Sequence, residues 1–360
     1  MNRLLIIQSE HAEYNFGPIS RSRGLYEPVN ICQQITGKSY DHVEYASPGE
    51  ILDIQNNLDC MLLVDHELIS YHTECLPQQI DTLIVHAYFE AFSQLNLQVI
   101  RSELSHLSDI WYVTNNLKIH QRDDIPENVQ VAAYDFFSGY TVCGMQEWHR
   151  PTDVQITEQR DFLCLNNKPR ECRKHMVQSL HRYGLGTHGY ISYHTQLLEG
   201  PNPFDDLVDL GDAGIVVPAF WDIKPWADRV YFEIVGEHVV RSNRFNDEDF
   251  IFITEKTYRS MLNGLPFMIN GKPHTLQYLK SLGFKTYDGL FDESYDSVAN
   301  WQTRIQLIVA QAKKFSKLST KQKQLWQSKA QPIIDHNREH LLNNHAKLFI
   351  EPVRINHNES

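Results

Sequence analysis

The segment Phe250–Asp296 reads FIFITEKTYRSMLNGLPFMINGKPHTLQYLKSLGFKTYDGLFDESYD and predicts one strand–helix–strand unit of an α/β domain. Phe250–Ile253 is a short apolar run of the kind that forms a buried strand. Thr254 follows it as a residue type that caps helices well, so a helix is expected over Glu255–Asn263. Pro266–Ile269 (PFMI) then predicts a second buried strand.

The same alternation of strands and helices extends toward the N-terminus of this segment. Further strands are expected at Phe162–Leu165, Gly189–Tyr193 and Val230–Val235, and a helix at Glu171–Tyr183. After the segment, Ser297–Leu348 is predicted to be wholly helical. Because strands and helices alternate, a parallel, doubly wound sheet is favoured.

The N-terminal half shows a comparable alternation. Buried strands are expected at Arg3–Gln8, Cys60–Asp65, Ile110–Thr114 and Val129–Ala133, and a helix at about Pro77–Gln94. In a sheet of this kind, ligands bind in the crevice at the carboxyl ends of the strands.

The apolar pattern lapses around Glu147–Gln159, which indicates a domain boundary. We expect an N-terminal Rossmann-like domain over residues 1–155, a second one over residues 156–300, C-terminal helices over residues 301–350, and a frayed tail over residues 351–360. The fold class is therefore α/β, with two Rossmann-like domains.

Composition places this chain of 360 residues, 42% hydrophobic and 22% charged, among ordinary folded proteins. The short apolar run near the N-terminus does not resemble a signal peptide, and no run is long enough to cross a bilayer, so a soluble, cytoplasmic protein is expected. The net charge of −12 argues against nonspecific coating of nucleic acid. The six scattered cysteines are read as reduced, mostly buried thiols: Cys32, Cys60, Cys75, Cys143, Cys164 and Cys172.

Several enzyme classes lack their sequence signatures here. The chain has no phosphate-binding P-loop, no G-x-G-x-x-G after a strand, and no G-x-S-x-G elbow. Nucleotide triphosphatases, dinucleotide dehydrogenases and α/β-hydrolases therefore have little support. The 18 histidines are dispersed without a metal-binding spacing, so no metal and no other cofactor is expected.

The start of the helix after Phe250–Ile253 carries residues suited to a nucleoside diphosphate. Glu255 lies in the first turn, where the helix dipole favours a carboxylate, and Lys256 is expected beside exposed backbone N–H groups. A lysine at a helix N-terminus suits a diphosphate, and the carboxylate can accept hydrogen bonds from both ribose hydroxyls. The plain structural alternative is a dipole-compensating glutamate beside a solvated lysine.

A resemblance favours the functional interpretation. T-E-K-T, G-x-P-F, G-F-x-T-Y and D-E-x-Y-D within residues 250–296 look like a family of glycosyltransferase-like proteins of large tailed phages and some bacteria. They also resemble, more distantly, the donor domain of fucosyltransferases. LNNKPRECRKHMVQSLHRYGL (Leu165–Leu185) and VYFEIVGEH (Val230–His238) resemble two further segments of that family.

This resemblance implies a GT-B glycosyltransferase, in which the two Rossmann-like domains face a cleft and the C-terminal helices pack back across both. It implies a hexosyl- or pentosyltransferase that works without a bound metal, with residues 1–155 as the acceptor domain and residues 156–300 as the nucleotide-sugar donor domain. It places Arg170 and Lys256 on the donor diphosphate and Glu255 on the ribose. Thr254 belongs to the same element. Arg173 either adds a contact or pairs with an acid such as Glu171.

Two acidic features remain open in this interpretation. Glu237 follows a strand and either binds the donor sugar or has a structural hydrogen-bonding role. The cluster of Asp292, Glu293 and Asp296 fits capping and interdomain contact better than a metal site.

A catalytic base is expected from the N-terminal domain. Asp65 and Glu67, with His66 between them, directly follow a predicted strand and are the preferred candidates. Alternatives are Ser9, Glu10, His11 and Glu13 after the first strand, and Glu90 in an apolar context.

The expected reaction moves a sugar from a nucleotide-sugar donor to an acceptor hydroxyl. The acceptor is left open between a hydroxymethylated pyrimidine of phage DNA, in the host cytoplasm, and a glycan or another small molecule. Residues considered for holding nucleic acid are Trp111, Tyr112, Arg21 and Arg23. The alternatives are a catalytically idle nucleotide- or carbohydrate-binding module on the same scaffold and, more weakly, a nucleotide-sugar epimerase.

Overall fold

The chain forms two compact units in the computed structural model, one mainly of residues 1–139 and one of residues 140–247 and 251–345. The structure describes residues 2–8, 28–46, 58–64, 80–87, 102, 104, 106–114, 125–133, 135, 137–139, 141–142, 157–166, 170–193, 223–237 and 251–345. The boundary predicted at residues 155/156 lies outside these ranges.

The first unit contains a six-stranded sheet in the order β2-β1-β3-β4-β5-β6, and every pairing in it is parallel. Its elements in chain order are β1 (Arg3–Gln8), α2 (Pro28–Thr36), β2 (His42–Ala46), β3 (Leu58–Val64), β4 (Ile80–Ala87), β5 (Ile110–Thr114) and β6 (Val129–Ala133). The chain reverses its winding direction between β1 and β3. A parallel sheet of this order has its ligand crevice at that reversal, outside the carboxyl ends of the two strands.

Strand β4 corrects the helix predicted over Pro77–Gln94. Residues Ile80, Leu83, Ile84 and Ala87 recur at helical spacing, but the segment pairs in parallel with both β3 and β5. Leu83, Ile84 and Val85 are all fully buried. A central strand covered on both faces is continuously apolar, and that pattern overlaps with a buried helix over so short a run. Neither α2 nor β2 was among the predicted elements.

The second unit contains a four-stranded parallel sheet in the order β10-β9-β7-β8. Its strands are β7 (Phe162–Cys164), β8 (Gly189–Ile191), β9 (Phe232–Gly236) and β10 (Phe267–Asn270). All four coincide with strands predicted from the sequence, although β9 and β10 each end one residue later than predicted. Here the winding reverses between β7 and β9, as it does between β1 and β3 in the first unit. Two Rossmann-like α/β sheets are thus present, as the sequence predicts.

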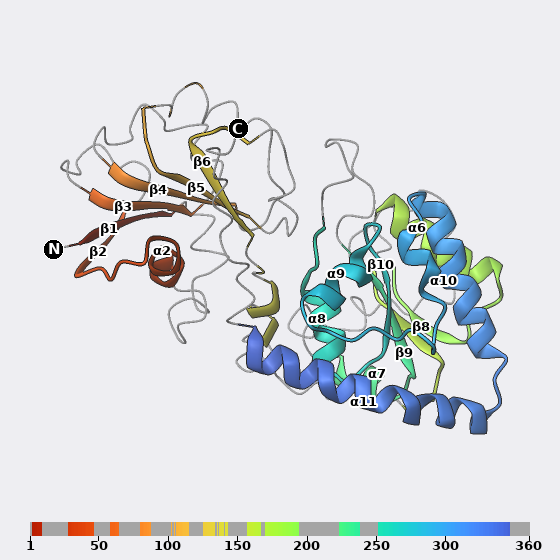
Figure 1. Ribbon diagram of the computed structural model, residues 1–360. Coiled ribbons are helices and arrows are strands. Elements are labelled where there is room, and N and C mark those ends of the chain that lie inside the picture. Colours follow the sequence, from red (N-terminus) through yellow and green to blue (C-terminus); the bar gives the residue numbers. More distant parts are fainter. Residues whose placement is uncertain are drawn as a thin grey trace. The chain divides into compact units, whose positions relative to one another are not determined.

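Helices cover both faces of the second sheet. On one face, α6 (Glu171–Arg182) packs with α10 (Trp301–Ser316), which lie together on one side of the sheet in Figure 1. On the same face the Phe232 ring lies 5.0 Å from that of Phe315 in α10. Helices α7 (Lys224–Ala227) and α8 (Glu255–Leu262) belong to the other face.

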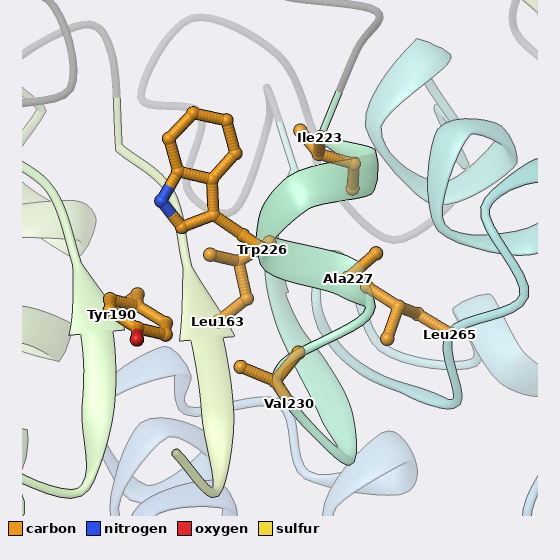
Figure 2. Close-up of a cluster of buried hydrophobic side chains, with 7 residues drawn as sticks. All are labelled: Leu163, Tyr190, Ile223, Trp226, Ala227, Val230 and Leu265. Carbon is orange, nitrogen blue, oxygen red and sulfur yellow. The ribbon is translucent and has the colours of Figure 1, made fainter. Parts of the chain in front are cut away.

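A buried apolar cluster joins α7 to this second face. Figure 2 shows Trp226 of α7 close to Leu163 of β7, and Ala227 of α7 beside Leu265. Tyr190 of β8, Ile223 and Val230 complete the cluster, and every member is at most 7% exposed. The cluster packs α7 against β7 and β8, the strands that lead to Asn166 and Ser192 at their carboxyl ends.

The approach to α8 differs from its prediction in one respect. Ile251–Ile253 is buried, but it forms no strand, so the strand predicted at Phe250–Ile253 is wrong for its described part. The helix itself starts and ends as predicted to within one residue: Thr254 is its N-cap and Asn263 its C-cap. Gly264 follows with φ +71°, a left-handed conformation that glycine adopts readily.

The region predicted to be wholly helical, Ser297–Leu348, contains two helices with a short break between them in its described part: α10 and the long α11 (Thr320–Asn344), which begins with a capping box at Ser319. Before this region lie α9 (Thr275–Ser281) and a 3₁₀ turn, η7 (Glu293–Ser297). Helix α11 contacts the starts of strands: Lys323 pairs with Asp161 just before β7 at 2.5 Å. Further along, the Asn337 side chain exchanges two hydrogen bonds of 2.8 Å with the backbone of Lys285. We infer that α11 braces the amino-terminal edge of the second sheet and leaves the carboxyl edge to the site.

The thiols agree with their prediction where they are described. Cys32, Cys60, Cys164 and Cys172 are buried and free of disulfides, and burial raises the pKa of Cys164 to about 12. Cys75 and Cys143 lie outside the described residues. In the described part of the chain, no helix is both long enough and apolar enough to span a membrane.

Candidate donor site

The candidate site lies at the carboxyl ends of β7 and β9, where the winding of the second sheet reverses. Asn166, two residues after β7, brings its side-chain oxygen to 3.3 Å from the point where a Cβ on Gly236 would stand. Arg173 of α6 donates from Nη2 to the Gly236 carbonyl oxygen at 3.2 Å. A side chain at position 236 would crowd these contacts, so glycine lets α6 and the loop after β7 approach the end of β9 closely.

Two arginines enter this edge from the start of α6. Arg170 is the N-cap residue of the helix, in extended conformation, and its side chain does not cap the helix. Arg173, one turn later, is only 3% exposed. Burial lowers the pKa of Arg173 below its ordinary value, as does the positive charge of Arg170, while Glu237 and Glu255 act in the opposite direction. Arg173 therefore interacts electrostatically with Arg170 at the start of α6, with Glu237 after β9 and with Glu255 at the start of α8.

Glu237 holds the start of α8 in place. Its side chain is fully buried, and Oε1 accepts hydrogen bonds from the Thr254 backbone N–H at 3.1 Å and from the Thr257 hydroxyl at 2.6 Å. Its Oε2 accepts from the Thr254 hydroxyl at 2.6 Å. These contacts match the structural alternative considered for Glu237. They also identify Thr254, at 1% exposure, as part of the support of the site.

Glu255 and Lys256 form an ion pair at the first turn of α8. Lys256 Nζ lies 2.5 Å from Glu255 Oε1 and 3.2 Å from the Thr254 hydroxyl oxygen. Only 14% of the Lys256 side chain and 12% of the Glu255 side chain are exposed. Burial by itself would raise the pKa of Glu255, but the Lys256 ammonium and a backbone N–H bring it below its ordinary value of 4.5. At neutral pH, the carboxylate is charged and paired.

The backbone amides at the start of α8 are already engaged. The N–H of Thr254 donates to Glu237, that of Lys256 to the Thr254 hydroxyl at 3.4 Å, and that of Thr257 to the Thr254 carbonyl at 3.2 Å. This corrects the expectation that Lys256 stands beside exposed N–H groups. An anion at this edge has to be bound mainly by side chains.

Helix α8 is anchored to β9 by a second buried carboxylate. Glu233 accepts from Arg259 Nη2 and from the Ser260 hydroxyl, each at 2.6 Å, and the ion pair is 1–4% exposed. Glu237 holds the first turn of α8 and Glu233 holds the next turn. Because both carboxylates come from the β9 segment, they fix the orientation of α8 relative to that strand.

The acidic cluster after β10 caps local structure, as predicted. Asp296 accepts from the backbone N–H groups of Leu276 and Gln277 at the start of α9, and Asp292 Oδ1 accepts from Ser294 N–H at 3.0 Å. Glu293 bonds the Thr286 hydroxyl at 2.7 Å and pairs with Lys280 at 3.2 Å. Within the described ranges, no group of three or more histidine, cysteine or acidic residues is arranged to hold a metal ion.

The expected donor residues are linked to one another within one unit. Arg170, Glu237 and Glu255 each interact electrostatically with Arg173, Glu237 accepts a hydrogen bond from Thr254, and Glu255 pairs with Lys256. The expected base residues Asp65 and Glu67 lie outside the described residues, as do His66, Ser9, Glu10, His11, Glu13 and Glu90. In the chain, the residues from Ser9 to Glu13 follow β1 and those from Asp65 to Glu67 follow β3, the two strands that flank the reversal in the first sheet. Glu90 follows β4.

Two residues considered for nucleic-acid binding have another role. Trp111 is 2% exposed and Tyr112 is fully buried, both within the central strand β5. They are core residues of the first sheet and cannot stack on a base from this position. Arg21 and Arg23 lie outside the described residues.

Sequence reasoning missed Asn166 and Ser192 as members of this edge. The Asn166 backbone N–H donates to the Ser192 hydroxyl at 3.0 Å, which links the ends of β7 and β8. The signal was present in the sequence, because Asn166 stands in the quoted segment LNNKPRECR four residues before Arg170.

Comparison with solved structures finds glycosyltransferases at low sequence identity. The chain is similar to α1,3-fucosyltransferase with GDP-fucose, with a TM-score of 0.43 and 7% identity over 96% of this chain and 90% of the other. It is also similar to T4 phage BGT in complex with its UDP-glucose substrate, with a TM-score of 0.39 and 10% identity over 96% of both chains. No protein-family model and no curated protein sequence matches the chain.

Proposed function

We propose that the chain is a glycosyltransferase that binds a nucleotide-sugar donor at the carboxyl edge of the second sheet and transfers the sugar to an acceptor hydroxyl. The observation that carries the proposal is that Arg173 interacts electrostatically both with Arg170 and with Glu255, which is paired with Lys256, at the reversal between β7 and β9. Open parallel sheets bind ligands at this place, and nucleotides are common among them.

The charges suit a nucleoside diphosphate leaving group. When the bond to the sugar breaks, negative charge develops on the diphosphate, and fixed cations lower the energy of that state. Arg170 is partly exposed and presents a planar fork of donors, which matches phosphate oxygens. Lys256 adds a second positive charge from α8, and Glu255 beside it offers acceptors for ribose hydroxyls. Arg173 and Glu237 support these groups from within the protein.

The acceptor and the base belong to the first unit in this proposal. Asp65 and Glu67 follow β3, one of the two strands that flank the reversal in the first sheet. A carboxylate there would take the proton of the acceptor hydroxyl. Since Trp111 and Tyr112 are core residues, a glycan or another small acceptor has more support than a flipped DNA base.

The test is turnover with a panel of nucleotide sugars. The protein is incubated with UDP-, GDP- and CMP-sugars without an acceptor, and the release of free nucleotide is measured over hours. Slow release with one donor is the expected result, because glycosyltransferases hydrolyse donors slowly when water replaces the acceptor. Binding without any release would favour an idle binding module. If no donor binds and no nucleotide is released, the proposal is contradicted.

A further inference from the structure

The ion pair at the start of α8 has a consequence for which anions the site accepts. Lys256 is not held ready for a phosphate, because its ammonium already contacts Glu255 at 2.5 Å and Thr254 at 3.2 Å. The carboxylate of Glu255 is almost fully shielded from water, at 12% side-chain exposure. Any anion that reaches Lys256 therefore meets a negative charge that solvent screens poorly.

Two kinds of anion differ in how they meet this charge. Inorganic pyrophosphate must either draw Lys256 away from Glu255 or bind beside the carboxylate, and it offers Glu255 no hydrogen-bond donor in return. A nucleoside diphosphate carries the same phosphates together with two ribose hydroxyls. Those hydroxyls can donate to Glu255 when Lys256 turns to the phosphates, so both members of the pair regain partners.

We infer that Glu255 is a specificity-determining residue, which makes the site reject bare phosphates and accept ribonucleoside diphosphates by holding Lys256 until ribose hydroxyls replace it. The inference rests on the proposed function, since it assigns both residues to the donor nucleotide. It adds a selection step that the binding roles alone do not imply. Rejection of a ligand by an uncompensated charge is a general route to specificity.

The surroundings of the pair favour a local exchange over a wider rearrangement. Thr254 is fixed by two hydrogen bonds to Glu237, and Arg259 and Ser260 tie the next turn to Glu233. The helix backbone is thus held in position while the side chains of Glu255 and Lys256 change partners.

Calorimetric titration of the full chain with three probes, in the presence of EDTA, tests the inference. The three kinds of probe are inorganic pyrophosphate, a ribonucleoside diphosphate, and the 2′,3′-dideoxy analogue of that nucleotide. UDP and GDP are each used as the ribonucleoside diphosphate. The proteins are the wild type, Glu255→Gln and, as a matched control, Glu293→Gln, which loses the pair with Lys280 outside the site. If Glu255→Gln fails to fold by circular dichroism, Glu255→Ala takes its place.

In the wild type, ribonucleoside diphosphate should bind more tightly than both other probes. In Glu255→Gln, pyrophosphate should bind about tenfold or more tighter than in the wild type, because the competing charge is gone. The advantage of the ribonucleotide over its dideoxy analogue should shrink by a similar factor. Glu293→Gln should behave as the wild type does.

The outcomes separate the inference from the proposed function. If the wild type binds a ribonucleoside diphosphate but Glu255→Gln binds pyrophosphate no more tightly, the inference is overturned and the proposed function stands. If the wild type binds neither ribonucleoside diphosphate, the proposed function fails and the inference fails with it.

Discussion

Glu237 and Thr254, 17 residues apart in the chain, are joined by two hydrogen bonds, one to the Thr254 backbone N–H and one to its hydroxyl. A carboxylate at the end of β9 thereby sets where α8 begins. The two residues that face the proposed donor, Glu255 and Lys256, come directly after this fixed point. The geometry of the site depends on a group that need not touch the ligand.

Replacement of Glu237 by glutamine should weaken both folding and the site. The glutamine has one oxygen where the carboxylate offers two, so at least one of the three donors from Thr254 and Thr257 loses its acceptor. We expect a loss of about 1–3 kcal/mol in the free energy of unfolding, measured by urea denaturation. Glu171→Gln, at an exposed position in the first turn of α6, is the control and should change stability little. A variant as stable as the wild type would contradict the role given to Glu237.

The buried pair of Glu233 and Arg259 should show strong coupling in a double-mutant cycle. Removal of one partner leaves the other charged and buried, so Glu233→Leu or Arg259→Met alone should cost about 3–5 kcal/mol. The double variant should lose clearly less than the sum of the two. Additive losses in denaturation would show that the pair contributes nothing beyond its separate side chains.

Gly189, the first residue of β8, should not tolerate a side chain. A Cβ at this position would stand 2.3 Å from Cε2 of Phe162, a ring that is fully buried in the core of the second unit. Gly189→Ala should therefore lower the stability by about 1–3 kcal/mol in thermal or chemical denaturation. The control is Gly139→Ala, where no atom lies within 4 Å of the new Cβ. Equal stability of the two variants would contradict the packing described here.

The stability contributed by Glu255 should depend on pH in one direction. Its pKa in the folded protein lies below its ordinary value of 4.5, so its contribution is fully present above that value and is lost as the pH falls through the lower, folded pKa. Unfolding free energies of the wild type and Glu255→Gln, compared from about pH 7 to about pH 3, isolate this contribution. The advantage of the wild type should shrink at the acid end. If the difference in unfolding free energy between the wild type and Glu255→Gln grew toward low pH, the lowered pKa of Glu255 would be contradicted.

The sequence predicted much of the sheet structure because the strands are short, buried and rich in β-branched or aromatic residues. The predicted bounds of β1, β5 and β6 are those of the structure. Ile80–Ala87 misled because its apolar residues fit a helix and a buried strand equally well, and only pairing with β3 and β5 decides between them. Phe252 and its neighbours look like a strand for a similar reason, yet Ile251–Ile253 is buried without forming a strand.

The parts of the site that depend on residues close together in the sequence were predictable. Thr254 as N-cap and Glu255 in the first turn follow from residue type and position along one helix. The engagement of the N–H groups by Glu237 was not predictable in this way, because it joins residues that are distant in sequence. The place of Asn166 likewise depends on the strand order, which brings the ends of β7 and β9 together.

The central claim is that Arg170 and Lys256 bind the same diphosphate. Isothermal titration of the ribonucleoside diphosphate that binds most tightly tests it directly, with Arg170→Ala, Lys256→Ala, the double variant, and Lys280→Ala as an exposed control outside the site. Each single variant in the site should weaken binding about tenfold or more, and the double variant should lose less than the product of the two because both act on one ligand. Lys280→Ala should bind as the wild type does. Wild-type affinity in both Arg170→Ala and Lys256→Ala, with the fold intact, would contradict the claim.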